Sequence, residues 1–359
     1  MPEGFDVPPE RSRSIQYVNV LRVLSIYTVV TAHVVIWLTM ATRPFTFNWW
    51  LGSGLFYLAH FCIPVFVMIS GALLLDDARR ESAGQFYRRR MVRVGIPLVV
   101  WTVVYLLVRR FVDGEPLSVG LVVQLILTGE PYYHLWFLYM IFGLYLITPA
   151  LRTFVRCAGQ GQRWFVIVLG LVLTNAYFQT DVLLWNNQRS IFTMFVPFIP
   201  FYLCGYEIRL IDPKKVPMRY LVLAVVLSAL YLAAFSGVFV ERAGGVGVRY
   251  LFDFFSLPAV FLSIGVFWAA YLWDTGHPPL QGIRRTALEW VASTVMGIYI
   301  LHPLVLIVMR ETLGKRAGNA DGPRDFLAGI VVVPLVTFVV CYLVTSLLMN
   351  IPLLKRTVC

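Results

Sequence analysis

The sequence predicts an all-α integral membrane protein with about ten transmembrane helices and both termini in the cytoplasm. Hydrophobic residues make up 59% of the 359 residues and charged residues only 14%, whereas soluble proteins carry about 25% charged residues. The mean hydropathy is +0.74. Ten apolar stretches are long enough, or nearly so, to cross a hydrocarbon core of about 30 Å. A soluble enzyme is therefore excluded.

The stretches divide the chain into a polar cytoplasmic segment at 1–16, one membrane domain at 17–349 and a cytoplasmic tail at 350–359. Arg11 and Arg13 precede a first helix without a small-residue cleavage site, which predicts an uncleaved helix. The expected spans are 17–38, 51–75, 94–112, 135–151, 164–184, 191–208, 220–240, 250–273, 288–309 and 326–349. A further apolar run at 117–128 is too short to span and favours a re-entrant or interfacial helix.

The distribution of basic residues gives an independent orientation. With the N-terminus inside, the inner segments hold 19 of the 30 Lys and Arg residues, and the outer ends and loops hold 10. Cytoplasmic loops of membrane proteins carry this excess. The bias is strongest between the second and third spans, and an even number of spans places both termini in the cytoplasm.

The net charge of +11 therefore indicates membrane orientation rather than nucleic-acid binding. The five cysteines form no close pair that predicts a metal or disulfide motif.

Arg22 and His33 are ionisable residues inside the first expected span. Such groups are costly in a membrane, which makes each a functional candidate. Eleven positions along a helix separate them by about 16 Å, close to one face. Arg22 is expected in the inner half of the membrane and His33 in the outer half. The alternatives are an arginine that reaches the inner headgroups and a histidine that only packs.

The other histidines also group by expected depth. His60, His134 and His302 are expected in the outer half, and His277 falls in an inner loop. A neutral imidazole in the outer half is suited to act as a base on a hydroxyl. A metal site is not expected, because no two of these histidines share a helix with ligand spacing. Taken singly, His60, His134 and His302 fit a structural role.

A basic run at 87–93 enters the third span. The spacing of Arg90 and Arg93 predicts that they lie on neighbouring turns of one helical face, which suits a phosphate or pyrophosphate. The alternative is ordinary cytoplasmic charge that contacts anionic lipid. That alternative fits Arg93 less well, because the apolar span begins directly after it.

Four segments together resemble the acyltransferase-3 family of bacterial membrane O-acyltransferases. The segments are 20–22 with 31–33, the run PVFVMISGALLL at 64–75, the run HLWFLY at 134–139 with 143–149, and GIYILHP at 297–303. Each motif is weak alone, but their order and spacing cover residues 15–349.

The resemblance implies ten helices with cytoplasmic termini and transfer of an acyl group from cytoplasmic acyl-CoA to an acceptor hydroxyl outside. It implies that Arg22 and His33 are central to activity and that Arg90 and Arg93 serve acyl-CoA. The sequence has no extra hydrolase-like domain of the kind that some relatives carry, so transfer is expected within the membrane domain.

On this hypothesis Arg90 and Arg93 hold the CoA phosphates, Arg22 supports the pantetheine arm, and the thioester reaches His33. His33 is then a general base or a transient acyl carrier, and the sequence does not choose between them. His134, Tyr299 and His302 are candidates for positioning the acceptor. Roles for His60 and Asp253 stay open.

The expected partners are acyl-CoA, with acetyl-CoA favoured, membrane lipids and an envelope sugar or glycolipid such as a trehalose mycolate. No metal cofactor is expected. The expected location is the bacterial cytoplasmic membrane. The leading alternative function is a transporter or flippase for an envelope glycolipid, since helices with internal prolines also occur in carriers. A structural scaffold is a third reading, and it leaves Arg22 and His33 unexplained.

Overall fold

The computed structural model describes residues 16–76, 81–184, 190–213, 218–233, 253–317 and 323–358, and the regular elements there are all helical. The N-terminal half holds α1 (Gln16–Met40), α2 (Phe47–Leu58), η1 (Ala59–Phe61), α3 (Cys62–Leu74), α4 (Ala83–Arg90), η2 (Met91–Gly95), α5 (Ile96–Phe111), α6 (Val119–Thr128) and α7 (Trp136–Cys157). The remainder holds α8 (Gln160–Leu184), η3 (Val196–Phe198), α9 (Ile199–Ile208), α11 (Leu257–Gly276), α12 (Gly282–Ser293), α13 (Val295–Ala317), α14 (Pro323–Met349) and α15 (Pro352–Val358).

The predicted all-α membrane class is confirmed, and within the described ranges seven helical stretches are long and apolar enough to cross a membrane. They are Gln16–Met40, Phe47–Leu74, Ala83–Phe111, Trp136–Cys157, Leu257–Gly276, Val295–Thr312 and Pro323–Met349. The other three expected spans coincide with α8, with η3 and α9, and with the shorter apolar helix Met218–Ala233. The count of ten crossings and the cytoplasmic placement of the termini stay predictions.

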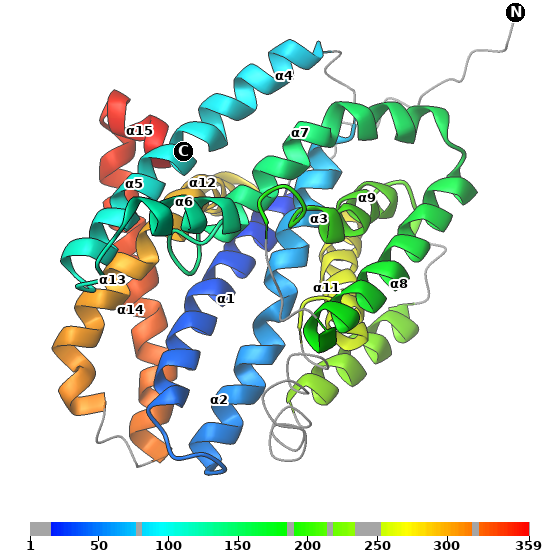
Figure 1. The fold of residues 1–359 in the computed structure, drawn as a ribbon. Helices are drawn as coiled ribbons and strands as arrows, with labels where there is room; N and C mark the ends of the chain where they lie inside the picture. Colours follow the sequence, from blue (N-terminus) through cyan, green and yellow to red (C-terminus); the bar gives the residue numbers. More distant parts are fainter. Residues whose placement is uncertain are drawn as a thin grey trace, which may run out of the picture.

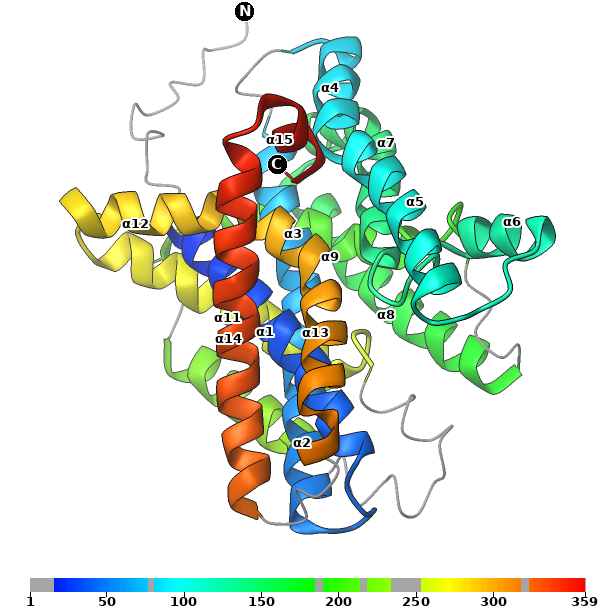
Figure 2. The same cartoon turned by 90° about the vertical axis from the view of Figure 1, so that its left-hand side faces the viewer.

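The central helix is α1, which packs against α2, α3, α11, α12, α13 and α14 (Figure 1). Its buried positions include Ile26, Val30 and Val34, which share a face at four-residue spacing. Because neighbours surround this helix, its polar side chains face protein. The view in Figure 2 shows α13 and α14 beside α1, and α6 projecting from the side of the helical body.

Two expected spans have different boundaries in the structure. The span expected at 288–309 is two helices, α12 and α13, which separate at Thr294. The Ser293 hydroxyl donates to the carbonyl of Trp290 and the Thr294 hydroxyl to that of Val291. Such side-chain bonds compete with the helical pattern and favour a bend. The span expected at 94–112 extends back to Ala83, so the basic run belongs to the helix.

Helices α3 and α9 pack with their backbones in contact. A methyl group on Gly71 would overlap the carbonyl of Tyr202, and one on Gly205 would overlap that of Met68. Only glycine permits such a close approach. The Gly71 position lies in the PVFVMISGALLL run, so the motif has a packing function in this structure.

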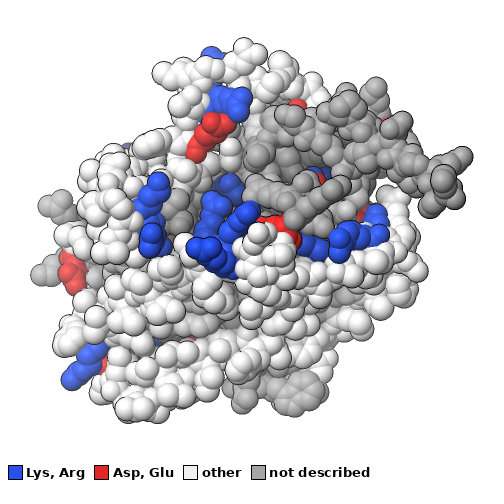
Figure 3. All heavy atoms as spheres, turned by 90° about the horizontal axis from the view of Figure 1, so that it is seen from above, with Lys and Arg blue, Asp and Glu red and all other residues white. Residues whose placement is uncertain are grey.

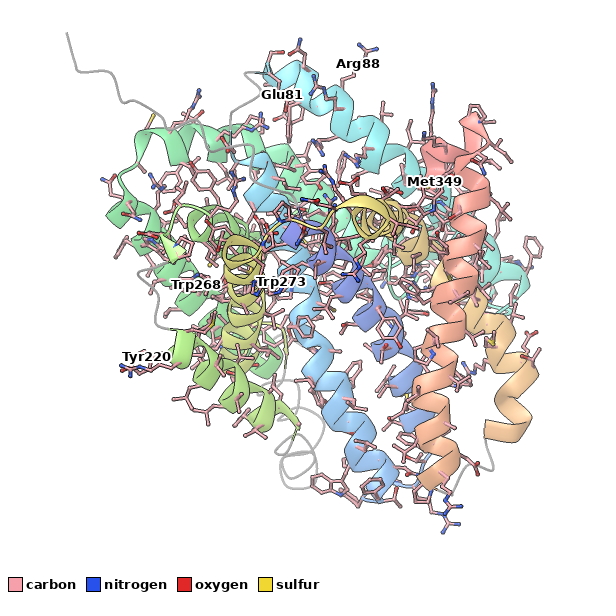
Figure 4. All side chains as sticks on the ribbon, turned by 180° about the vertical axis from the view of Figure 1, so that it is seen from behind. Glu81, Arg88, Tyr220, Trp268, Trp273 and Met349 are labelled. Carbon is pink, nitrogen blue, oxygen red and sulfur yellow. The ribbon has the colours of Figure 1, made fainter. Side chains whose placement is uncertain are left out.

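Charged residues collect at the end of the molecule that carries α4, which we call the basic end. Arg89, Arg90, Arg152 and Arg163 lie there, and so does α15 (Figure 1). Figure 3, which looks onto this end, shows Lys and Arg gathered across the middle of the face with Asp and Glu among them. In Figure 4, Glu81 lies beside the start of α4, and Arg88 points away from the protein.

Candidate functional site

Three histidines from distant parts of the chain meet beside α1. The His33 ring lies 5.2 Å from that of His302 on α13, nearly parallel to it at 25°. The His302 ring in turn lies 5.3 Å from that of His134, at 77°. The Tyr133 ring also lies close to His33, at 4.9 Å between ring centres. The structure therefore brings His33, His134 and His302 into one cluster.

Hydrogen bonds set the roles of two ring nitrogens in this cluster. His302 Nδ1 lies 2.7 Å from the carbonyl oxygen of Tyr299, so Nδ1 carries the proton and Nε2 is left as an acceptor. That Nε2 is buried and has no hydrogen-bond partner among the described residues. The Tyr299 hydroxyl donates to the main-chain carbonyl of His134. Tyr299 thus connects α13 to the segment that precedes α7.

The His33 ring has no hydrogen bond to the described part of the chain. The ring nitrogens lie in the ring plane, and the His302 ring is stacked rather than edge-on to His33, so the two do not exchange a proton directly in this geometry. The His134 ring makes no hydrogen bond of good geometry within the described residues, although the carbonyl of Ile300 lies close to it. Both rings therefore have nitrogen atoms available for a ligand.

A cavity of about 110 Å³ adjoins the cluster. His33 on α1, His134 before α7 and Tyr299 on α13 contribute to its wall, together with His60 of η1. Most other lining side chains are apolar or aromatic, and Phe254 is one of them. The cavity is thus an apolar chamber whose polar groups are mainly imidazoles, which is the general form of a small-molecule site.

Helix α5 holds the segment that brings Tyr133 and His134 to the cavity. The Tyr105 ring stacks on Tyr132 at 4.7 Å and meets the His134 ring edge-on at the same distance. One turn further along, Arg109 Nη1 donates to the carbonyls of Glu130 and Pro131 at 3.3 and 3.4 Å. Two residues of one helix therefore fix the position of this loop.

The same arginine forms a two-point ion pair with Glu115. Arg109 Nε lies 2.6 Å from Glu115 Oε2 and Nη2 lies 3.1 Å from Oε1. The hydrogen bond from Arg109 lowers the pKa of the Glu115 carboxyl below its usual value. Burial raises the pKa of the nearby Tyr132 hydroxyl to about 12, and Asp113 adds to the rise. Tyr132 is therefore a neutral phenol at physiological pH, and Glu115 is charged.

A second group of polar residues lies toward the basic end of α1. Arg22 is close enough to Arg93 and Arg90 to interact with both electrostatically, and also with Tyr145 of α7. The Arg90 guanidinium lies 5.4 Å from the Phe86 ring centre and 5.5 Å from that of Tyr145. Its Nε is buried without a hydrogen-bond partner in the described chain. Among the described residues these three arginines form no ion pair, although Glu81 interacts electrostatically with Arg90, and this excess of positive charge favours an anionic ligand.

Arg93 lies in η2, a π-helical turn between α4 and α5. A π-helical turn has more residues per turn than an α-helix, so the single helical face predicted for Arg90 and Arg93 is wrong in its detail. Arg93 is exposed, whereas Arg90 is partly buried. Such π turns often occur at functional sites. Both arginines nevertheless interact with Arg22.

Other arginines of the basic end have a structural role. Arg152 is only 7% exposed; its Nε donates to the carbonyl of Leu74 at 2.7 Å and its Nη2 to Glu81 at 3.1 Å. Glu81 also pairs with Arg89 at 2.9 Å. These contacts connect α3, α4 and α7 and fix the frame of the arginine group.

The residues predicted from the sequence lie in two groups, the histidine cluster and the arginine group. Helix α1 connects the two groups, because it carries both His33 and Arg22. The His134, Tyr299 and His302 candidates do lie near His33. The sequence analysis did not identify Tyr105 or Arg109 as residues that position the site. The only indication in the sequence was that Arg109 lies near the end of an apolar span. Tyr133 was not placed in the site either, because an aromatic residue near the outer end of a span is typical of the membrane interface. Within the described ranges, His, Cys, Asp and Glu side chains form no group of three or more suited to a metal ion.

A family model described as an acyltransferase domain, that of acyltransferase family 3, matches residues 15–349. The chain belongs to this family. The predicted resemblance is thus confirmed over nearly the whole sequence, and the protein is a membrane protein of the acyltransferase-3 family. No significant match to the chain was found among curated proteins or among solved structures.

Proposed function

We propose that this acyltransferase-3 protein moves an acyl group, most simply acetyl, from cytoplasmic acyl-CoA to a hydroxyl of an envelope sugar or glycolipid. The observation that carries the proposal is the pairing of two sites along α1. The arginine group at the basic end suits the phosphates of CoA, and the histidine-lined cavity lies about 16 Å further along the same helix. A pantetheine arm has a similar length.

Charge and polarity support the division of work between the two sites. Arg90 and Arg93 bind the CoA phosphates, and Arg22 continues the positive surface into the membrane domain. The cavity then receives the thioester carbonyl and the acceptor hydroxyl away from bulk water. Transfer passes through His33, while His134, Tyr299 and His302 position the acceptor side. A trehalose mycolate is one acceptor of suitable chemistry in a bacterial cytoplasmic membrane.

A transporter or flippase fits these contacts less well. Two buried carboxylates of the described chain are in ion pairs, Glu207 with Arg163 and Glu81 with Arg152. Paired carboxylates are poorly suited to bind a coupling ion. The thermal stability of the purified protein in detergent distinguishes the two functions. Acetyl-CoA and CoA raise the unfolding temperature of an acyltransferase by preferential binding to the folded state, whereas a glycolipid carrier does not respond.

Replacement of His33 tests the proposal directly. We expect His33→Ala to abolish acyl transfer to an extract of envelope glycolipids and glycans, measured with radiolabelled acetyl-CoA. The exchange leaves the arginine group untouched, so the thermal shift with CoA is retained. His277→Ala is the matched control, because His277 is exposed and outside the cavity. Turnover in the His33→Ala protein would remove His33 from the reaction.

A further inference from the structure

The cavity wall contains a histidine that the transfer scheme above leaves without a role. His60 lies in η1, the turn that joins α2 to α3, and it lines the cavity together with His33. Its ring is held between Phe254, at 4.7 Å, and Phe56, at 5.0 Å. His60 and His33 therefore open into one chamber from different helices, with the His60 ring fixed by aromatic neighbours.

A hydrogen bond fixes which nitrogen of His60 is free. Nδ1 lies 3.0 Å from the carbonyl oxygen of Phe56. Because a carbonyl only accepts, Nδ1 carries the proton, and Nε2 of the neutral ring has an open lone pair. This is the arrangement of an oriented base, in which one nitrogen is anchored and the other accepts a proton. The bond to the carbonyl also stabilises the imidazolium that forms.

His33 has the complementary arrangement. No hydrogen bond to the described residues anchors its ring, and its neighbours are the faces and edges of Tyr133 and His302. An unanchored imidazole has one nitrogen free to attack a carbonyl and a second that carries a proton to release. His33 and His60 thus differ in whether a hydrogen bond anchors the ring, and this is the property that separates a nucleophile from a base.

The chamber restricts what reaches these nitrogens. Its lining residues include no Asp, Glu, Lys or Arg, so a charged group is not favoured there. Its volume of about 110 Å³ is smaller than the roughly 150 Å³ cavity that holds one benzene molecule. A short uncharged acyl group and the carbon that bears the acceptor hydroxyl fit such a volume.

We propose that His33 carries the acyl group and that His60 is the base that activates the acceptor hydroxyl. This inference rests on the function proposed above. In the first step a His33 nitrogen attacks the thioester carbonyl, the carbon–sulfur bond breaks, and the CoA thiolate takes the proton from the other His33 nitrogen. The products are neutral acyl-His33 and CoA thiol.

In the second step the acceptor oxygen attacks the carbonyl of acyl-His33 while its proton passes to His60 Nε2. The new ester bond forms, the carbon–nitrogen bond to His33 breaks, and His33 recovers a proton from His60 within the shared cavity. Both rings return to the neutral state, so no further reactant is needed. The acceptor class that this chemistry selects is an uncharged alcohol on a carbon narrow enough to enter the cavity.

The test separates the two steps in purified full-length protein with radiolabelled acetyl-CoA. Without acceptor, we expect stoichiometric CoA release and a label on the peptide that contains His33, in the natural protein and in His60→Phe. With the envelope extract as acceptor, we expect His60→Phe and His60→Gln to slow transfer by about 10²-fold or more, since this is the size of a general-base contribution. Added imidazole should restore part of the transfer in His60→Ala.

His277→Phe is the matched control. His277 makes the same local contact, with Nδ1 2.8 Å from the carbonyl of Trp273, but it lies outside the cavity, so its replacement should change neither step. Formation of acyl-His33 in the His60 variants also shows that they are folded.

This inference is overturned if His60→Phe transfers the acyl group at the rate of the natural protein, or if transfer proceeds without acyl-His33. Either result leaves the proposed function intact. Absence of transfer by the natural protein overturns both. Full activity of His60→Gln, which keeps a polar group but no base, also overturns the assignment of His60.

Discussion

At the scale of single residues, the environment of each ionisable group separates functional from structural roles. Arg152 and Arg163 have carboxylate or carbonyl partners, so their charges hold helices together. Arg22 and Arg90 have other arginines and aromatic rings as neighbours. Glu81 adds an electrostatic interaction with Arg90 but forms no ion pair with it. Positive groups with so little compensation among the described residues are unfavourable unless an anion binds, which is the basis of the proposed site for the CoA phosphates.

Exchange of the two arginines should weaken acyl-CoA binding unequally. We expect Arg90→Gln to raise the Kd for CoA about tenfold or more, the value of a charge-assisted hydrogen bond. Arg93→Gln should have a smaller effect, because Arg93 is exposed and its interactions are screened by water. Isothermal titration with CoA measures both. Arg88→Gln is the control on the same helix, since its side chain points away from the protein (Figure 4). Equal Kd values for all four proteins would assign the basic run to lipid contact.

At the scale of the elements, close backbone contact and a fixed loop shape the site. The contact of α3 with α9 depends on glycine, and the loop before α7 depends on Arg109. Neither feature touches the reacting groups. Each sets where a helix or loop lies, and thereby where His60 or His134 is held.

Alanine at the crossing of α3 and α9 should destabilise the fold. Gly71→Ala and Gly205→Ala each place a methyl group against a backbone carbonyl, and such overpacking costs about 1–3 kcal/mol. The unfolding temperature in detergent should fall for both. Gly84→Ala serves as the control, because Gly84 lies in α4 with nothing near its added methyl. That exchange should be neutral or stabilising by up to about 1 kcal/mol. A fall of similar size in all three proteins would contradict the packing explanation.

Loss of the Arg109 contacts should affect turnover and spare acyl-CoA binding. In Arg109→Leu the carbonyls of Glu130 and Pro131 lose their donor, and the segment that carries Tyr133 and His134 is free to shift. A displacement of this kind lowers the rate by as much as about 10²-fold. Steady-state transfer and CoA titration together measure the separation, and Arg110→Leu is the neighbouring control, with an exposed side chain.

Acid pH should weaken the same contact by a different route. The pKa of Glu115 is lowered by its bond to Arg109, so the ion pair is complete above the ordinary pKa of a glutamate. It is lost only as the pH falls through that lowered value.

Unchanged turnover in Arg109→Leu would show that α5 positions the loop through Tyr105 alone.

At the scale of the whole molecule, the basic end defines the orientation. Its Arg residues lie on the face of Figure 3, and the connection between α1 and α2 lies at the opposite end (Figure 1). Since cytoplasmic faces carry the excess of positive charge, the basic end is expected in the cytoplasm. The proposed CoA site and the proposed acceptor site are then reached from opposite sides of the membrane.

Cysteine labelling in spheroplasts tests this orientation. Cys157 is exposed at the last residue of α7, toward the basic end. With Cys359→Ser in the background, we expect Cys157 to react with an impermeant maleimide only after the membrane is opened. Arg43→Cys, combined with Cys157→Ser, lies in the connection between α1 and α2 and should react in closed spheroplasts. The reverse pattern would invert the topology and place the arginine group outside.

The amino-acid sequence alone predicts the membrane class, most helix positions, the family resemblance and the placement of Arg22 and His33 on one helix. These features depend on hydropathy, charge bias and spacing within single segments, which are local properties. The tertiary structure decided which other residues join them. His60 and His134 line the cavity, and His302 stacks on His33 beside it. These three histidines come from segments far apart in the chain, and their positions depend on how α3 and α13 pack against α1 and on how α5 holds the loop before α7. The π turn at Arg93 depends on backbone hydrogen bonds, and the break at Thr294 is favoured by hydroxyl-to-carbonyl bonds. Side-chain periodicity reveals neither. The local sequence pattern therefore predicts that Arg22 and His33, the two ends of the proposed site, lie on one helix. The neighbours of His33 in the cavity wall depend on long-range packing.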